Sequence, residues 1–110
     1  MLIGIGCDIT SVNRFKNKDD NFVKKILSNE EYTIYLSKKG HQKAEFLAGR
    51  FAAKEAIIKA IPESEKIAMS TINIFYEGEK PLCTYKNYRI LLSISHEKSY
   101  AISYVTIEKR

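Results

Sequence analysis

The sequence predicts an α+β fold in which an antiparallel β-sheet packs on one long helix. Three observations support this prediction: a short apolar run at residues 2–9, a long helical pattern at residues 42–61, and alternating apolar and polar positions at residues 71–107. A strand, then helices, then a β-meander is typical of this class. With 110 residues the chain has room for one hydrophobic core, so we expect a single domain over residues 1–110.

The first strand is predicted over residues 2–9. It is apolar except at Gly4 and Gly6, and we expect it to end at Asp8. Glycine inside a strand indicates a place where another backbone or a ligand comes close.

Two helical segments follow the first strand. The pattern over residues 12–27 is helical but is interrupted at residues 18–21. Ser28 and Glu31 have the spacing of a capping box, which predicts a second short helix that ends near residue 37. Gly40 then has the position of a left-handed C-cap.

The remaining elements are the long helix and the meander. Pro62 ends the helix predicted over residues 42–61 because proline cannot continue a helix. Strands are predicted over residues 71–76, 82–85, 88–95 and 100–107.

The net charge indicates the kind of partner, and the cysteines and histidines argue against a zinc site. The formal net charge is +5 and the pI is near 9.2, so we expect an acidic partner, which charge alone does not identify. Cys7, Cys83, His41 and His96 have none of the spacings of a zinc site. We therefore expect two reduced cysteines.

We expect a cytoplasmic protein that is not bound to a membrane. The chain begins with MLIGIG and reaches Asp8 too early for the apolar core of a signal peptide. Nothing later in the sequence approaches the length of an apolar membrane span.

The long helix carries charges where apolar residues dominate. Residues 46–61, FLAGRFAAKEAIIKAI, are apolar or small on nearly all sides but include Arg50, Lys54, Glu55 and Lys59. One interpretation pairs Glu55 with Lys59 at i,i+4 and lets Arg50 and Lys54 extend to solvent. The other is that these charges bind a phosphorylated ligand, because isolated buried charges are costly.

Asp8 adds a second carboxylate to this second interpretation. Mg²⁺ prefers a few carboxylate oxygens and fills its other positions with water and substrate phosphate. Asp8 and Glu55, with lysine and arginine nearby, fit that preference. Taken alone, Asp8 is better explained as the cap of a turn or of the following helix, so the residues by themselves indicate only a candidate magnesium–phosphate site.

Three segments together resemble a known family. GIGCDIT (residues 4–10) with Arg14, FLAGRFAAKEAIIKA (residues 46–60) and SISHEKSYA (residues 93–101) resemble the holo-acyl-carrier-protein synthases. These are the short bacterial members of the 4′-phosphopantetheinyl transferase superfamily. Order and spacing match over essentially the whole chain, including the turn GEKP at residues 78–81, whereas residues 61–66 replace a glycine-rich loop.

The resemblance implies an enzyme that transfers 4′-phosphopantetheine from coenzyme A to a serine of acyl carrier protein in fatty acid biosynthesis. It also implies the superfamily fold, a homotrimer with active sites at subunit interfaces, and catalysis by Asp8, Glu55 and Lys59. Asp8 and Glu55 would hold Mg²⁺. The implied coenzyme A ligands are Arg50, Lys54, Lys43, Ser95 and His96, and the implied carrier-protein contacts are Arg14, Lys24 and Lys25.

Two other readings remain open beside the enzyme. A small basic nucleic-acid-binding module is compatible with the charge and the seven tyrosines, although the chain has no RNP-like strand and no GXXG loop. A trimeric structural protein without catalysis is the other, and the presence of Asp8, Glu55 and Lys59 argues against it. Within the enzyme class, we expect a free carrier protein as acceptor rather than a domain of a larger synthase.

Overall fold

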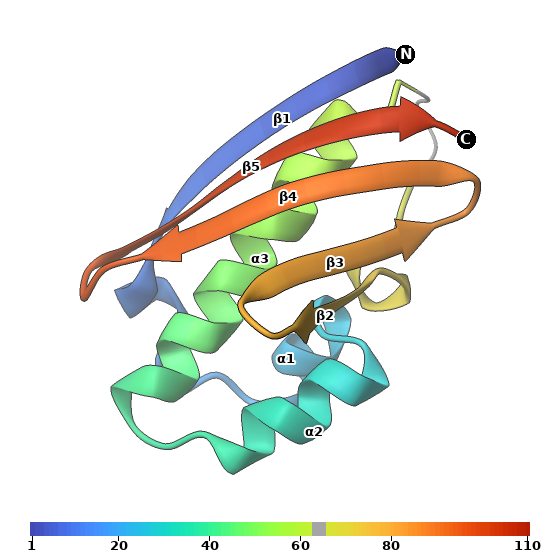
Figure 1. Cartoon of the computed structure of the whole chain (residues 1–110). Helices are drawn as coiled ribbons and strands as arrows, with labels where there is room; N and C mark the ends of the chain where they lie inside the picture. Colours follow the sequence, from blue (N-terminus) through green and yellow to red (C-terminus); the bar gives the residue numbers. More distant parts are fainter. Residues whose placement is uncertain (63–65) are drawn as a thin grey trace.

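A curved antiparallel sheet lies against one long helix in the computed structural model, which describes residues 1–62 and 66–110 (Figure 1). The strands are β1 (Leu2–Ser11), β2 (Asn73–Glu77), β3 (Lys80–Tyr85), β4 (Tyr88–His96) and β5 (Tyr100–Lys109). Their order in the sheet is β1-β5-β4-β3-β2. The helices are η1 (Val12–Phe15), α1 (Asp20–Ile26), α2 (Asn29–Ser37), α3 (His41–Ala60) and η2 (Met69–Thr71). The predicted α+β arrangement is confirmed.

The first strand is longer than predicted. β1 pairs with β5 from Leu2 to Ser11, and Asp8 lies opposite Ser103 within this ladder. The expectation that Asp8 ends the strand is therefore wrong. A carboxylate can occupy the middle of a strand when its side chain reaches a partner, and the partner of Asp8 is Lys59.

The capping box is confirmed and the glycine cap is not. The Ser28 side chain accepts a hydrogen bond from the Glu31 N–H, and the Glu31 side chain accepts one from the Ser28 N–H. α2 ends with Lys38 as its C-cap, so Gly40 lies too far along the chain to cap it. Gly40 instead is the N-cap of α3, at φ 59° and ψ −135°, where its positive φ turns the chain into the long helix.

β1 lies directly on the backbone of α3. A Cβ added to Gly4 would be 1.8 Å from the Ala60 carbonyl oxygen, and one added to Gly6 would be 1.9 Å from the Ala56 carbonyl oxygen. The close approach that the two glycines predicted is confirmed. It places the helix-facing side of β1 against successive turns of α3.

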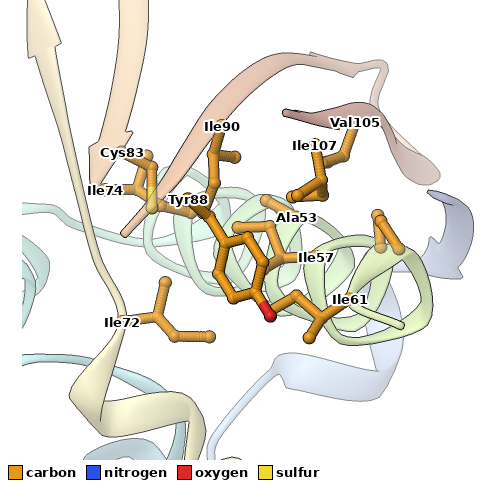
Figure 2. Packing of buried hydrophobic residues seen from close by; sticks show 12 residues of the cluster. Ala53, Ile57, Ile61, Ile72, Ile74, Cys83, Tyr88, Ile90, Val105 and Ile107 are labelled. Atoms are coloured by element: carbon orange, nitrogen blue, oxygen red, sulfur yellow. The ribbon is translucent and has the colours of Figure 1, made fainter. Parts of the chain in front are cut away.

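The main core fills the space between α3 and the inner face of the sheet (Figure 2). Alternate residues of the strands point into it, as the period of two predicts. Its members include Ala53, Ile57, Ile61, Ile72, Ile74, Cys83, Tyr88, Ile90, Val105 and Ile107. A second cluster packs α1 and α2 against the first half of α3. Among the described residues, no helix is long and apolar enough to cross a membrane.

Candidate functional site

Asp8 and Lys59 meet where β1 crosses α3. The Lys59 Nζ donates hydrogen bonds to Asp8 Oδ1 at 3.1 Å and to the Cys7 carbonyl oxygen at 3.2 Å. The strand–helix contact gives the position of Asp8 along α3. Gly4 faces Ala60, and Gly6 faces Ala56 one turn earlier. Two residues of strand advance about as far as one helical turn, so Asp8 lies beside the turn that precedes Ala56.

That turn carries Glu55. Glu55 is half-buried, and its carboxylate makes neither a hydrogen bond nor an ion pair with any residue of the described chain. The predicted i,i+4 pair between Glu55 and Lys59 is therefore wrong, because Lys59 reaches across to Asp8 instead. The result is one carboxylate from a strand, one from the adjoining helix turn, and an ammonium group between the two elements.

This donor set fits Mg²⁺. Among the described residues, no group of three or more histidine, cysteine, aspartate or glutamate side chains could hold a metal ion. Mg²⁺ commonly uses only one or two carboxylates and takes its other ligands from water and substrate phosphates. Asp8 and Glu55 provide that number.

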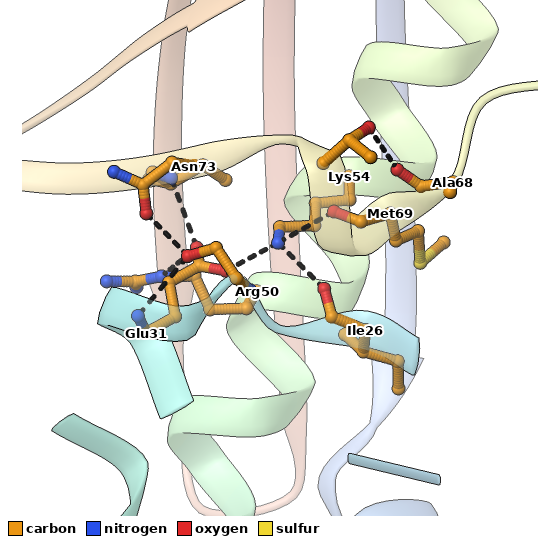
Figure 3. A network of polar contacts seen from close by, with 10 residues as sticks. Ile26, Glu31, Arg50, Lys54, Ala68, Met69 and Asn73 are labelled. Atoms are coloured by element: carbon orange, nitrogen blue, oxygen red, sulfur yellow. Dashed lines mark hydrogen bonds and ion pairs between the residues drawn. The ribbon is translucent and has the colours of Figure 1, made fainter. Parts of the chain in front are cut away.

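Arg50 and Lys54 are buried rather than extended to solvent. Arg50 is 5% exposed and Lys54 is 0% exposed, so the interpretation in which both reach water is wrong. Figure 3 shows both side chains in contact with Glu31 of α2. The Glu31 side chain is fully buried. Arg50 Nε donates to Glu31 Oε2 at 3.1 Å, and Lys54 Nζ donates to Glu31 Oε1.

Lys54 has a full set of protein acceptors. Besides Glu31, its ammonium donates to the carbonyl oxygens of Ile26 at 2.7 Å and Met69 at 3.0 Å. Burial lowers the pKa of Lys54, and the Glu31 carboxylate opposes that change. An ammonium with three acceptors and no exposed surface has no proton left for a phosphate, so we do not retain Lys54 among the coenzyme A ligands.

Arg50 and His96 converge on one groove. The Arg50 guanidinium lies over the Phe46 ring at 4.4 Å and near the Tyr76 ring at 5.2 Å. The His96 Nδ1 is 3.2 Å from Glu45 Oε2. The groove has a volume of about 570 Å³ and is lined by Ile34, Lys38, Glu45, Phe46, Gly49, Arg50, Phe75, Tyr76, Ile94 and His96.

Ser95 and Lys43 lie away from this groove. Ser95 is exposed opposite Ile102 on β5, on the outer face of the sheet. Lys43 lines a different cavity, of about 490 Å³, and its Nζ lies 4.8 Å from the centre of the Tyr35 ring. Within one chain the structure therefore brings together Arg50 and His96 but not Ser95 or Lys43.

The three predicted docking cations lie on η1 and α1. Arg14 donates to Thr10 Oγ1 at 3.3 Å, and its guanidinium lies 5.1 Å from the centre of the Phe51 ring. Lys24 and Lys25 are exposed in the last turn of α1. Arg14 therefore adjoins the end of β1 beyond Asp8, whereas Lys24 lies beside Tyr32 of α2, with its Nζ 5.1 Å from the centre of that ring.

Sequence reasoning missed the second role of Glu31. The capping-box spacing identified it as a helix cap, which it is. The presence of two cations in an otherwise apolar helix also required a buried acid, but nothing in the spacing indicates that this acid comes from α2. Glu45, the partner of His96, was missed for the same reason.

Known proteins of similar sequence identify the family of this chain. Residues 4–105 match the 4′-phosphopantetheinyl transferase superfamily. The holo-[acyl-carrier-protein] synthase of Mycoplasma mycoides is 46% identical over 103 residues, which cover 93% of this chain and 91% of the relative. The chain belongs to the holo-[acyl-carrier-protein] synthases of this superfamily. The synthase of a Geobacillus strain is 41% identical, over 99% of this chain and 98% of its own.

Solved structures of the family share the fold. The Bacillus anthracis synthase, in complex with CoA (3′,5′-ADP), superposes with a TM-score of 0.91 at 36% identity and covers 100% of this chain and 99% of its own. The Helicobacter pylori synthase in complex with coenzyme A gives a TM-score of 0.76 at 28% identity, over 94% of this chain and 99% of its own. Residues 63–65, where the sequence departs from the glycine-rich loop of the family, lie outside the described residues.

Proposed function

We propose that this chain transfers the 4′-phosphopantetheine arm of coenzyme A to a serine of apo acyl carrier protein and releases 3′,5′-ADP, the activity for which its family is named. The observation that carries this proposal is the contact of Lys59 with Asp8, on the strand that packs against the helix that carries Glu55. It joins the opening strand motif to the long-helix motif at one point on the surface.

The reaction requires that the reactants be positioned and that the charge on the diphosphate be neutralised. The serine oxygen forms a bond to the β-phosphorus of coenzyme A, the bond from that phosphorus to the bridging oxygen breaks so that this oxygen leaves with 3′,5′-ADP, and the serine proton passes to solvent. Negative charge accumulates on the diphosphate, as in other phosphoryl transfers. Mg²⁺ held by Asp8 and Glu55 would neutralise part of this charge. Lys59, kept in place by Asp8, supplies a second positive charge at the same position.

The groove at Arg50 suits the nucleotide end of coenzyme A. It combines a guanidinium and an imidazole with three aromatic rings, those of Phe46, Phe75 and Tyr76. A guanidinium is well matched to phosphate oxygens, and aromatic walls suit an adenine ring. We assign Arg50 and His96 to this role; Lys43 remains a prediction.

The outer face of the sheet supports a homotrimer. It exposes large apolar side chains on adjacent strands: Ile5, Ile9, Leu91, Tyr100, Ile102 and Tyr104. Ile9 and Ile102 face each other across β1 and β5, and Ser95 is the neighbour of Ile102 on β4. A contiguous apolar face of this kind marks an interface. Because Ser95 faces away from the groove of its own chain, it reaches a bound nucleotide only if that nucleotide belongs to a neighbouring subunit.

The carrier protein is the partner we assign to the basic surface at Arg14, Lys24 and Lys25. The net charge of +5 favours an acidic partner. Arg14 follows directly on the strand that carries Asp8, so a serine presented beside Arg14 would be close to the proposed site of transfer.

Intact-mass analysis tests the reaction class. Apo acyl carrier protein is incubated with this protein, coenzyme A and Mg²⁺, and we expect the carrier to gain the mass of one phosphopantetheine. Chelation with EDTA should prevent the gain, and added Mg²⁺ should restore it. A carrier whose mass never changes, together with salt-sensitive binding of RNA, would replace the enzyme with a nucleic-acid-binding module.

A further inference from the structure

The Arg50 guanidinium is held from one side only. Its Nε donates to Glu31 at 3.1 Å, and its Cζ lies 4.4 Å from the centre of the Phe46 ring and 5.2 Å from the centre of the Tyr76 ring. Its two terminal nitrogens make no hydrogen bond within the described chain, yet no buried side-chain nitrogen or oxygen there lacks a partner. The terminal nitrogens are therefore reached from the groove that Arg50 lines.

Glu31 is itself immobilised by several elements. Its Oε1 accepts from the Ser28 N–H at 2.8 Å and from Lys54, and its Oε2 accepts from Arg50 and from the Ile74 N–H at 3.1 Å. These donors come from the start of α2, from α3 and from β2 (Figure 3). A carboxylate with four donors in a fully buried position has one orientation, and so has the guanidinium bonded to it.

The cluster leaves one positive charge unbalanced. Glu31 contributes one negative charge, and Arg50 and Lys54 contribute one positive charge each. Lys54 directs its ammonium to Glu31 and to two carbonyl oxygens. The uncompensated positive charge is therefore that of Arg50, which lines the groove. A buried charge that is only partly compensated favours an anion. The geometry therefore favours an anionic ligand, and the anion that the proposed function supplies is a phosphate group of coenzyme A.

We propose that Glu31 is a positioning residue for coenzyme A, which directs the terminal nitrogens of Arg50 toward a phosphate of the nucleotide without touching the substrate. This inference rests on the proposed function, because it takes the groove as the nucleotide site. It adds to the capping role of Glu31, since the cap uses Oε1 whereas the contact with Arg50 uses Oε2.

The substitution Glu31→Gln separates the two roles. The glutamine oxygen can still accept from the Ser28 N–H, but the amide nitrogen cannot accept from Arg50 Nε or from the Ile74 N–H. We expect the Kd for 3′,5′-ADP, measured by calorimetry, and the KM for coenzyme A to rise about tenfold, the usual scale for one charge-assisted hydrogen bond. The kcat at saturating coenzyme A should stay within about twofold, because the reacting centre is elsewhere.

Ser28→Ala is the matched control. It removes the hydroxyl that caps α2 and contacts Asn73, so it should lower the Tm without changing the Kd for 3′,5′-ADP. A double-mutant cycle that combines Glu31→Gln with Arg50→Lys is a second control. The double variant should bind 3′,5′-ADP no more weakly than Arg50→Lys alone, because Glu31 acts through Arg50.

The outcomes separate this inference from the proposed function. An unchanged Kd in folded Glu31→Gln, or effects that add in the double variant, would overturn the positioning role while transfer by the unmodified protein continues. Absence of transfer by the unmodified protein would instead overturn the proposed function. If Glu31→Gln does not fold, NMR of the unmodified protein decides: the Arg50 Nε–H should exchange slowly with solvent and its ¹⁵N shift should move on addition of 3′,5′-ADP. Rapid exchange or an unmoved signal would refute the role.

Discussion

Gly6 of β1 lies so close to Ala56 of α3 that a Cβ on the glycine would be 1.9 Å from the alanine carbonyl oxygen. This contact sets the distance between strand and helix over the stretch that carries Asp8 and Glu55. The fold and the proposed catalytic centre therefore depend on the same pair of backbones.

Gly6→Ala should damage both stability and activity. The added methyl meets backbone atoms, so β1 must move away from α3, and overpacking of this kind costs about 1–3 kcal/mol. We expect a lower Tm and a loss of transfer that is larger than the loss of folded protein. Gly49→Ala is the control for stability, because its added Cβ meets only a side-chain methyl of Ile94, at 3.3 Å. Equal stabilities for the two variants would contradict the contact.

Removal of either proposed magnesium ligand should abolish transfer and leave the fold intact. For Asp8→Asn and Glu55→Gln we expect rates at least about 10²-fold lower, because charge stabilisation at the diphosphate is lost. Initial rates are measured over a range of Mg²⁺ concentrations, with circular dichroism to check folding. Glu108→Gln, which removes a half-buried carboxylate on β5, should be fully active. Wild-type rates for both ligand variants would remove the metal site from the proposal.

Arg14→Glu should weaken the binding of carrier protein and leave the binding of coenzyme A unchanged. Reversal of an exposed charge acts mainly on the encounter with an acidic partner, so the KM for carrier protein should rise by about tenfold or more at low salt. The difference should shrink at high ionic strength because salt screens exposed charges. Arg110→Glu, at the other end of the molecule (Figure 1), should behave like the unmodified protein. The docking role fails if the carrier-protein KM is the same for both variants at all salt concentrations.

Tyr104→Asp should break the proposed trimer. Tyr104 is 53% exposed on the outer face of the sheet, and a carboxylate there would be desolvated in an interface. Light scattering should report three times the 12.6 kDa of one chain for the unmodified protein and a smaller assembly for the variant. Leu36→Asp changes an equally exposed residue of α2 and should leave the mass unchanged. A monomeric unmodified protein with full activity would contradict the trimer.

Cys83 should make the protein sensitive to alkali. Burial raises the pKa of the Cys83 thiol to about 12, from an ordinary value of 9.0. The thiol stabilises the fold fully below pH 9, because it is then protonated in both states. Above that pH the unfolded chain ionises first, so the free energy of unfolding falls between about pH 9 and pH 12, by about 1.4 kcal/mol at pH 10.

Urea unfolding at pH 8, 9 and 10 measures this effect, and comparison with Cys83→Ala separates it from the titration of tyrosines. The variant should lose less stability than the unmodified protein as the pH rises. Parallel pH profiles would show that the thiol is not buried as the structure has it.

Much of the fold could be predicted because its signals are local. The period of two in residues 71–107 and the helical pattern before Pro62 reflect which face of each element is buried. The capping box needs only Ser28 and Glu31, three residues apart. The two glycines of the first strand likewise predicted a close contact, although not which helix turn would make it.

The partners of the charges on α3 were decided by tertiary structure alone. One interpretation of the sequence paired Lys59 with Glu55, four residues away, but Lys59 contacts Asp8 across 51 residues of sequence. Arg50 and Lys54 share Glu31, 19 and 23 residues away. Local spacing shows which groups can meet on one helix, whereas the choice among distant partners depends on which elements pack together and which charges they bury. In a buried site that choice is strict, because each ion must find a partner there or not be buried at all.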